Sequence, residues 1–391
     1  MKVLHIGKFF PPHRGGIETH IFDLCRGLAR SADVDVIVAN DAPGYVEEQC
    51  ETIRVRRLAP VAKIASVPIC PQMARAIRET PADLVHLHLP NPYAGATFLA
   101  SNHKAPLVVS WHSDVVRQRL LNRLLRPVER ALIRRASAFI ASSPNYVESS
   151  PILNGNRSRC HVIPYGIDDL EMGKPDTTRI AALRRTYGSR IVLAVGRLVY
   201  YKGFDHLIRA MGTVKGHLLI VGEGPLRLKL MREAIDAGVN NRVTFLGNVS
   251  RAELINCYHA ADVFALPAVA RSEAFGIVQL EAMACGKPVV NTRLSCGVPY
   301  VSVDNETGIT VEPASSEPLA DAINRLLDDG ALRMVYGAAA RKRVRKHFNL
   351  DLMVDRTLDL YRQILNRNAV ELMAEQSHSS DTDQQPAFVQ A

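Results

Sequence analysis

Short apolar runs alternate with longer helical patterns along most of this chain, a pattern typical of α/β proteins with parallel sheets. The runs fall into two series. The first covers 3–7, 34–39, 53–58, 84–87, 107–111 and 138–141 and closes near 161–164, and the second covers 191–196, 218–222, 243–247, 263–266, 289–292 and 309–311. The sequence therefore predicts two Rossmann-like, doubly wound domains that face one cleft.

A chain of 391 residues is too long for a single hydrophobic core. We expect an N-terminal domain over 1–168 and a C-terminal domain over 169–346, with the connection between them in 165–178. A helical segment over 347–366 is expected to pack back on the N-terminal domain. The polar end of the chain, 367–391, is predicted to be a disordered tail.

The composition is ordinary for a soluble protein, with 47% hydrophobic and 22% charged residues. No apolar run approaches the length of a membrane span, and the first residues do not resemble a secretory signal. Seven scattered cysteines without paired CxxC spacing argue against a disulfide framework or a zinc site. We therefore expect a cytoplasmic protein.

Much of the net charge of +9 comes from a basic stretch over 117–135. In helical projection Arg119, Arg123, Arg126 and Arg130 gather on one side and leucines on the other, in a pattern interrupted by Pro127. Three interpretations stay open: a solvated surface helix, a peripheral contact with an anionic membrane, and a nucleic-acid patch. The last is the weakest because no aromatic residues are interleaved with the arginines, so no nucleic-acid partner is expected.

The most informative motif for function is the segment 272–281, in which two glutamates flank a small-residue turn. The apolar spacing predicts a helix from near Gly276 to Gly286, so that Glu273 precedes the helix and Glu281 lies on the order of 7 Å along it. The first backbone N–H groups, those of Phe275, Gly276 and Ile277, would form a phosphate site. This order matches sugar, diphosphate and ribose of a nucleotide sugar, and the alternative is a solvated helix with two unrelated glutamates.

Other polar or glycine-rich signals follow predicted strands, where open parallel sheets bind ligands. A loop after the first strand ends in Gly15-Gly16, and His112 follows the strand over 107–111. In the second half, the corresponding signals are Arg197 with Lys202, and then the glycine-rich turn 222–225. Each signal is weak alone.

Taken together, these motifs resemble the large retaining glycosyltransferase family of the family 4 type. That family includes bacterial mannosyltransferases and the sucrose- and trehalose-related synthases, and it has the two-Rossmann GT-B architecture. The resemblance covers about 1–365. Its strongest pieces are Gly196-Arg197-Leu198-x-x-x-Lys202-Gly203, Val221-Gly222-Glu223-Gly224-Pro225, Phe245-Leu246-Gly247-Asn248-Val249 and Glu273-x7-Glu281.

The resemblance implies a role for each matching residue. Arg197 and Lys202 would neutralise the donor diphosphate, Glu273 would hold sugar hydroxyls, and His112 would lie beside the transferred sugar. Ribose would bind Glu281. The remaining donor contacts would come from Gly15, Gly16, Gly222, Glu223, the backbone near Val249, and Phe275, Gly276 and Ile277.

A metal cofactor is not expected, because two cations and helix N–H groups can stabilise the departing diphosphate. The Asp33-Val34-Asp35 motif leads into a first-domain strand, and His86 and His88 alternate on a strand as packed or surface residues do. Retention of anomeric configuration follows from the resemblance alone. A front-face route is favoured over a covalent carboxylate nucleophile, since Glu281 is assigned to ribose.

The leading hypothesis is a transferase that moves a hexose from a nucleotide diphosphate sugar to a saccharide or lipid-linked acceptor. We expect this reaction at the cytoplasmic face of the membrane, in surface polysaccharide or glycolipid synthesis. Mannose from GDP-mannose is the first donor hypothesis, with UDP-hexoses and UDP-N-acetylhexosamines as alternatives. A nucleotide-sugar epimerase and a non-catalytic nucleotide-sugar-binding protein of the same fold also stay open.

Overall fold

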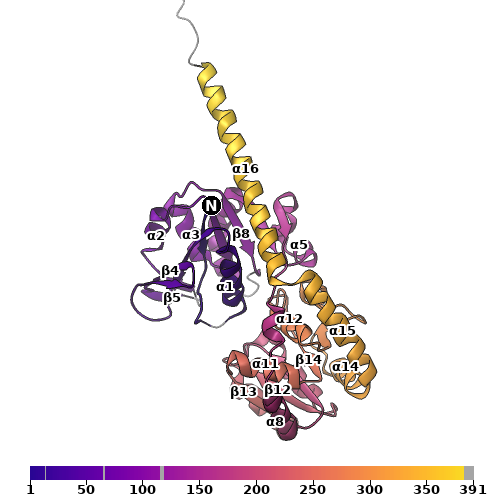
Figure 1. Ribbon diagram of the computed structural model, residues 1–391. Coiled ribbons are helices and arrows are strands. Elements are labelled where there is room, and N and C mark those ends of the chain that lie inside the picture. Colours follow the sequence, from indigo (N-terminus) through magenta and orange to yellow (C-terminus); the bar gives the residue numbers. More distant parts are fainter. Residues whose placement is uncertain (14, 65–66, 115–118, 383–391) are drawn as a thin grey trace, which may run out of the picture. The chain divides into compact units, whose positions relative to one another are not determined.

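The computed structural model describes residues 1–13, 15–64, 67–114 and 119–382, with side chains except for 119–124 and 371–382. The chain forms two compact units, and Figure 1 labels their elements. The first unit comprises Met1–Ser110, Leu120–Ile140 and Val354–Ala391. The second comprises Trp111–Arg119 and Ala141–Met353.

The sheet of the first unit has the strand order β9-β8-β7-β1-β2-β4-β3. Strand β1 pairs in parallel with β2 and β7, and β2 pairs in parallel with β4, whereas β3 pairs with β4 in antiparallel orientation. The strands of this unit are β1 (Lys2–Ile6), β2 (Asp33–Ala39), β3 (Val46–Cys50), β4 (Ile53–Leu58), β5 (Ala62–Ile64), β6 (Val67–Ile69), β7 (Leu84–Leu89), β8 (Leu107–Trp111) and β9 (Ala136–Ala141). The last residue of β8 and the last residue of β9 are counted with the second unit.

Strand β3 and the small β5–β6 pair were not predicted from the sequence. The β3 residues are mostly exposed and include Glu47, Glu48 and Gln49, so the strand has no apolar run to mark it. Backbone pairing with β4 makes it a strand. The parallel strands, whose residues are largely buried, were all predicted to within about two residues.

The first unit contains α1 (Gly16–Leu28), α2 (Met73–Glu79), α3 (Pro92–Ser101), α4 (Arg119–Arg135) and most of α16 (Leu350–Thr382). Helices α1 and α16 pack closely at Gly27, where an added Cβ would lie 2.2 Å from Val354 Cγ2. Helix α4 runs through Pro127 without the interruption that the sequence predicts. The packing of buried Leu132 against Gly95 of α3 stabilises the helix beyond the proline, which outweighs one missing hydrogen bond.

Helix α16 continues past residue 367, where the sequence predicts a disordered tail, as far as Thr382. The stretch 369–376 is rich in alanine, glutamate, leucine and methionine, all strong helix formers, so local propensity favours this extension. The rest of the predicted tail, 383–391, lies outside the described residues.

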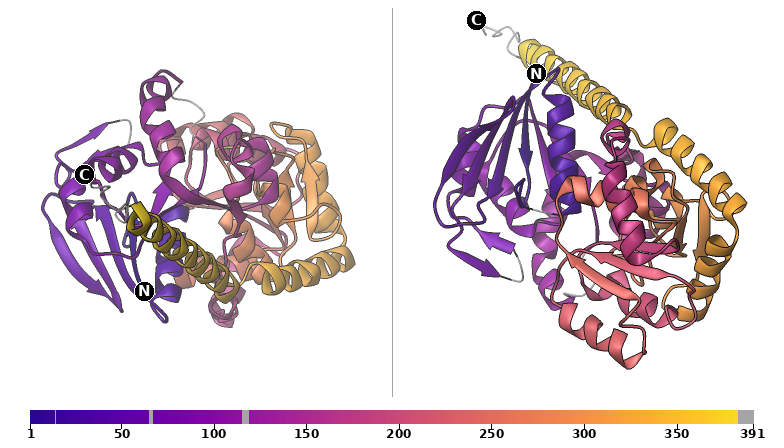
Figure 2. Two further views of the ribbon diagram at one scale, coloured as in Figure 1. Left: turned by 90° about the horizontal axis from the view of Figure 1, so that it is seen from above. Right: turned by 60° about the horizontal axis from the view of Figure 1, so that its bottom comes forward.

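The second unit is built on a parallel sheet of order β13-β12-β11-β14-β15-β16, which helices cover (Figure 2). Its strands are β10 (Cys160–Val162), β11 (Ile191–Val195), β12 (His217–Val221), β13 (Val243–Gly247), β14 (Val263–Ala265), β15 (Val289–Thr292) and β16 (Gly308–Val311). Its α-helices are α5 (Pro144–Ser149), α6 (Pro151–Asn154), α7 (Asp169–Met172), α8 (Thr177–Tyr187), α9 (Phe204–Ala210), α10 (Arg227–Asp236), α11 (Arg251–Ala260), α12 (Ile277–Ala284), α13 (Val298–Val301), α14 (Ser316–Asp328) and α15 (Gly330–His347), and short 3₁₀ turns lie at η1 (Arg157–Arg159) and η2 (Tyr200–Lys202).

The second unit begins earlier in the chain than the expected boundary at 168/169. The segment after β9 belongs to it because its side chains pack there: the Tyr165 ring lies 4.8 Å from the Phe275 ring. Gly166 lies against the backbone of Asn349, where an added Cβ would come within 2.3 Å of the carbonyl oxygen. These contacts join residues far apart in the sequence, which a boundary drawn from composition does not register.

Three buried histidines lie together in the first unit, on strands β1 and β7. His5 Nδ1 lies 3.0 Å from His88 Nε2, and His86 contacts Tyr361 Oη at 2.5 Å and Ser110 Oγ at 2.7 Å. His86 and His88 are therefore packed residues, one of the two roles that the alternating strand pattern predicts. Among the described residues, no helix is both long and apolar enough to cross a membrane.

This histidine cluster predicts a loss of stability in acid. Burial lowers the pKa of His5 from 6.5 to about 3. Between these two values the unfolded chain binds a proton at this position and the folded chain does not, so the free energy of unfolding falls as the pH drops through that window. We expect the melting temperature of His5→Leu to fall less steeply with decreasing pH than that of wild type. His206→Leu, at a partly exposed position on α9, is the control, and equal slopes for wild type and His5→Leu would contradict the prediction.

Candidate active site

The carboxyl ends of β11, β12 and β13 meet through glycines in the second unit. Gly196 donates its N–H to Val221 O at 2.9 Å, and Gly222 donates to Gly247 O at 2.8 Å. Gly222 has a φ of +130°, and an added Cβ would lie 2.2 Å from Gly196 O. No larger residue fits there, so the two loops run close together beyond the strand ends.

A buried ion pair lies beyond these strand ends. Lys202, at the end of η2, places Nζ 2.5 Å from Glu273 Oε2, and both side chains are about one-tenth exposed. The Lys202 chain passes over Gly196, whose hypothetical Cβ would lie 3.1 Å from Nζ. Burial alone would lower the pKa of Lys202, but the Glu273 charge raises it above 10.5, so the amine stays protonated.

Glu273 leads into α12 (Ile277–Ala284), which begins and ends where the sequence predicts. Gly276 precedes the helix with a φ of +76°, and Gly286 follows it with a φ of +69°. The turn before the helix is held by a neighbouring loop, in which Gly297 donates to Ala274 O at 2.7 Å. The first turn of α12, with its positive dipole end, therefore comes shortly after Glu273 in the chain.

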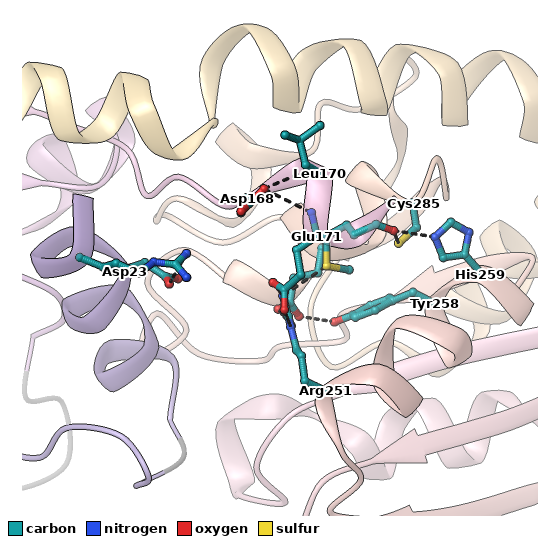
Figure 3. A network of polar contacts seen from close by, with 11 residues as sticks. Asp23, Asp168, Leu170, Glu171, Arg251, Tyr258, His259 and Cys285 are labelled. Atoms are coloured by element: carbon teal, nitrogen blue, oxygen red, sulfur yellow. Dashed lines mark hydrogen bonds and ion pairs between the residues drawn. The ribbon is translucent and has the colours of Figure 1, made fainter. Parts of the chain in front are cut away.

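The second glutamate, Glu281, contacts Arg251 and Tyr258, two of the residues labelled in Figure 3. Tyr258 donates its hydroxyl to Glu281 Oε2 at 2.6 Å, and Arg251 Nη1 contacts Oε1. Arg251 also pairs with Glu171 of α7, through Nε at 3.2 Å and Nη2 at 3.1 Å. A carboxylate accepts about four hydrogen bonds, so these two donors orient Glu281 and leave it capacity to accept more.

His112 lies at the end of β8 and belongs to the same unit as Glu273. Its Nδ1 lies 2.6 Å from Tyr165 Oη, and the Tyr165 ring packs at an angle of 60° to Phe275. Burial lowers the pKa of His112 from 6.5 to about 3. The imidazole is therefore neutral near pH 7 and is suited to hydrogen bonding rather than to carrying charge.

The remaining predicted residues have more varied surroundings. Arg197 is exposed in the loop after β11, and Glu223 pairs with Arg227 of α10. Val249 is half-buried in the loop between β13 and α11. Gly15 and Gly16 lie in the first unit at the start of α1, so their predicted approach to the donor stays a prediction.

Arg251, Tyr258 and Glu171 were not predicted from the sequence as the residues that hold Glu281. The only local signal is the spacing of Arg251 and Tyr258, which are seven residues apart in α11 and so lie on one helix face. Nothing in the sequence relates them to Glu281, because α7, α11 and α12 meet only in the folded unit.

Two family models match the chain in succession. A glycosyl transferase 4-like domain matches residues 15–166, and glycosyl transferases group 1 matches residues 177–343. The fold is also that of solved glycosyltransferases: sucrose-phosphate synthase of Thermosynechococcus elongatus superposes with a TM-score of 0.78 at 25% identity, covering 94% of this chain and 99% of that one. The chain belongs to the GT-B glycosyltransferases and is a transferase enzyme.

Three curated relatives are similar over nearly their whole length. The O-antigen chain mannosyltransferase C of Escherichia coli is 32% identical, over 93% of this chain and 99% of the relative. D-rhamnosyltransferase WbpZ of Pseudomonas aeruginosa is 32% identical, over 89% and 92%. A GDP-mannose-dependent alpha-(1-6)-phosphatidylinositol monomannoside mannosyltransferase of Mycobacterium tuberculosis is 30% identical, over 92% and 98%.

Proposed function

We propose that this glycosyltransferase moves a hexose, with retention, from a nucleotide diphosphate sugar to a saccharide or lipid-linked acceptor. The observation that carries the proposal is the buried Lys202–Glu273 pair directly before α12, with Glu281 oriented further along the same helix. Phosphate, sugar hydroxyls and ribose each find a partner of suitable chemistry there.

Transfer places negative charge on the departing diphosphate. Lys202, Arg197 and the first N–H groups of α12 supply positive charge and hydrogen-bond donors for it, which favours the transition state over the ground state. Glu273 accepts hydrogen bonds from sugar hydroxyls, and neutral His112 forms a hydrogen bond with the same sugar. The acceptor hydroxyl loses its proton to a donor phosphate oxygen on the same face of the sugar, which retains the anomeric configuration.

GDP-mannose is our first proposal for the donor. Two of the three relatives named above are mannosyltransferases, one of them GDP-mannose-dependent, whereas the third is a rhamnosyltransferase. UDP-hexoses and UDP-N-acetylhexosamines are the alternative donors. An epimerase or a non-catalytic binding protein is disfavoured by the family, although the assay below distinguishes both.

The proposed function is tested with a panel of donors. A donor that binds the native state raises the melting temperature by mass action, so thermal shifts with GDP-mannose, GDP, UDP-glucose and UDP-N-acetylglucosamine rank the candidates. The best donor is then incubated with and without saccharide acceptors. We expect nucleotide diphosphate release and a glycosylated product only with acceptor, and a changed sugar without acceptor would indicate an epimerase instead.

We further propose that transfer needs no metal cofactor, because the protein itself supplies the positive charge at the diphosphate. Turnover measured in excess chelator should equal turnover in untreated enzyme. Loss of activity that only Mg²⁺ or Mn²⁺ restores would contradict this proposal.

The basic helix α4 is our proposed contact with an anionic membrane. Arg126 and Arg130 are exposed there, whereas the side chains of Arg119 and Arg123 lie outside the described residues. Each arginine at an anionic surface contributes about 1 kcal/mol. We expect Arg126→Ser with Arg130→Ser to weaken vesicle binding at least about tenfold at low salt.

The matched control for this prediction is Lys342→Ser with Lys346→Ser, which removes the same charge from exposed positions on α15. It should leave binding to the same phosphatidylserine-containing vesicles unchanged. If wild type itself ignores these vesicles at low salt, α4 is only a solvated surface helix and the acceptor reaches the enzyme another way.

A further inference from the structure

An ion pair outside the predicted site joins two loops of the second unit. Asp114 lies two residues after His112. Its Oδ1 atom accepts hydrogen bonds from Trp111 Nε1 at 2.8 Å and from Ser150 Oγ at 3.0 Å. Its other oxygen, Oδ2, lies 3.3 Å from Arg271 Nη2. Arg271, two residues before Glu273, also donates from Nη1 to Ser149 O at 3.1 Å.

The two partners differ in how far their side chains are exposed to water. The Asp114 side chain is 11% exposed and that of Arg271 is 37% exposed. Apart from the Arg271 guanidinium, Oδ2 has no hydrogen-bond partner among the described residues. A buried carboxylate without a cation is costly, whereas a partly exposed guanidinium can be hydrated. Asp114 therefore depends on Arg271 for its charge balance.

We propose that Asp114 and Arg271 are positioning residues that hold the His112 loop in register with the Glu273 loop. Both loops carry groups assigned to the transferred sugar, so this inference rests on the proposed function. His112 and Glu273 reach the sugar from different parts of the chain, and a small change in their separation misplaces one of them. The pair acts on turnover through these two residues and touches no substrate itself.

Steady-state kinetics test the role in positioning. We expect Arg271→Met and Asp114→Asn each to lower kcat at least about tenfold while the KM for the donor changes less than about threefold. The double variant should be no slower than the slower single variant, because one interaction is lost in all three. Arg271→Lys should recover part of kcat. Arg209→Met, which removes a surface arginine paired with Asp205, should match wild type.

A second readout does not depend on the donor or on turnover. Trp111 is the only tryptophan of the chain, so intrinsic fluorescence reports directly on the residue that hydrogen-bonds Asp114. In the ligand-free protein, Arg271→Met should shift the emission to the red and increase acrylamide quenching, and Arg209→Met should do neither. Asp114→Asn keeps an oxygen acceptor for the indole and nearly the same volume, so it remains informative if Arg271→Met folds poorly.

The outcomes separate this inference from the proposed function. If no nucleotide sugar in the panel is a substrate but Trp111 responds to Arg271→Met, the proposed donor class fails and the link between the loops stands. If transfer occurs and the variants keep wild-type kcat and wild-type fluorescence, the positioning role is refuted. Independent, additive losses in the two single variants would also refute it.

Discussion

Replacing Lys202 with methionine should lower the free energy of unfolding by about 3–5 kcal/mol, the range seen when one partner of a buried ion pair is removed. Methionine has a similar length and is apolar, so it fills the same space beside Gly196. The Glu273 carboxylate then stays buried without its cation, and this uncompensated charge is the source of the loss. Chemical denaturation with urea measures the difference.

A double variant distinguishes the missing charge from a simple loss of packing. Lys202→Met with Glu273→Gln removes both charges, so it should recover most of the stability that Lys202→Met loses. It should not recover transfer, because neither the Lys202 charge nor the Glu273 charge remains to contact the donor. Lys229→Met, at an exposed position on α10, is the control and should unfold as wild type does. If the double variant is as unstable as Lys202→Met, the ion pair does not govern stability here.

The second large effect is expected in turnover. Glu273→Gln keeps the shape of the side chain but replaces a charged acceptor of sugar hydroxyls with a weaker neutral one. We expect kcat to fall at least about tenfold, which corresponds to about 1.4 kcal/mol of lost transition-state stabilisation. Binding of the free nucleotide diphosphate should persist, because Lys202 and Arg197 remain. In the variant the Glu273 carboxylate no longer competes with the diphosphate for Lys202.

Two measurements check this expectation. Isothermal calorimetry with the nucleotide diphosphate should give a Kd within about threefold of wild type, and initial rates should give the loss in kcat. Glu233→Gln is the matched control, since Glu233 is also an ion-paired glutamate but lies on α10 with Arg209 as its partner, outside the proposed site. A Glu273→Gln enzyme with wild-type turnover would remove Glu273 from the reaction. Normal kcat with weakened nucleotide binding would show instead that Glu273 serves to position Lys202.

Local patterns predict much of this molecule because local physics dominates in its sheets and in α12. Buried parallel strands need apolar residues on both faces, so they appear as continuous runs, and the glycines at 276 and 286 mark both ends of α12. The exposed strand β3 and the continuous helix through Pro127 were not predictable in this way. Backbone pairing with β4, the next strand along the chain, decides the first, and packing against α3, which is not adjacent in sequence, decides the second.

The sequence by itself determined the α/β class, the start and end of α12, and the positions of Glu273 and Glu281 on either side of its first turn. Only the tertiary structure decided that Lys202 and Glu273 form one buried pair, and that Arg251 and Tyr258 orient Glu281. The physical reason is range. Helix periods and glycine conformations are properties of neighbouring residues, whereas an ion pair or a shared hydrogen bond depends on where the parallel sheet brings separate loops together.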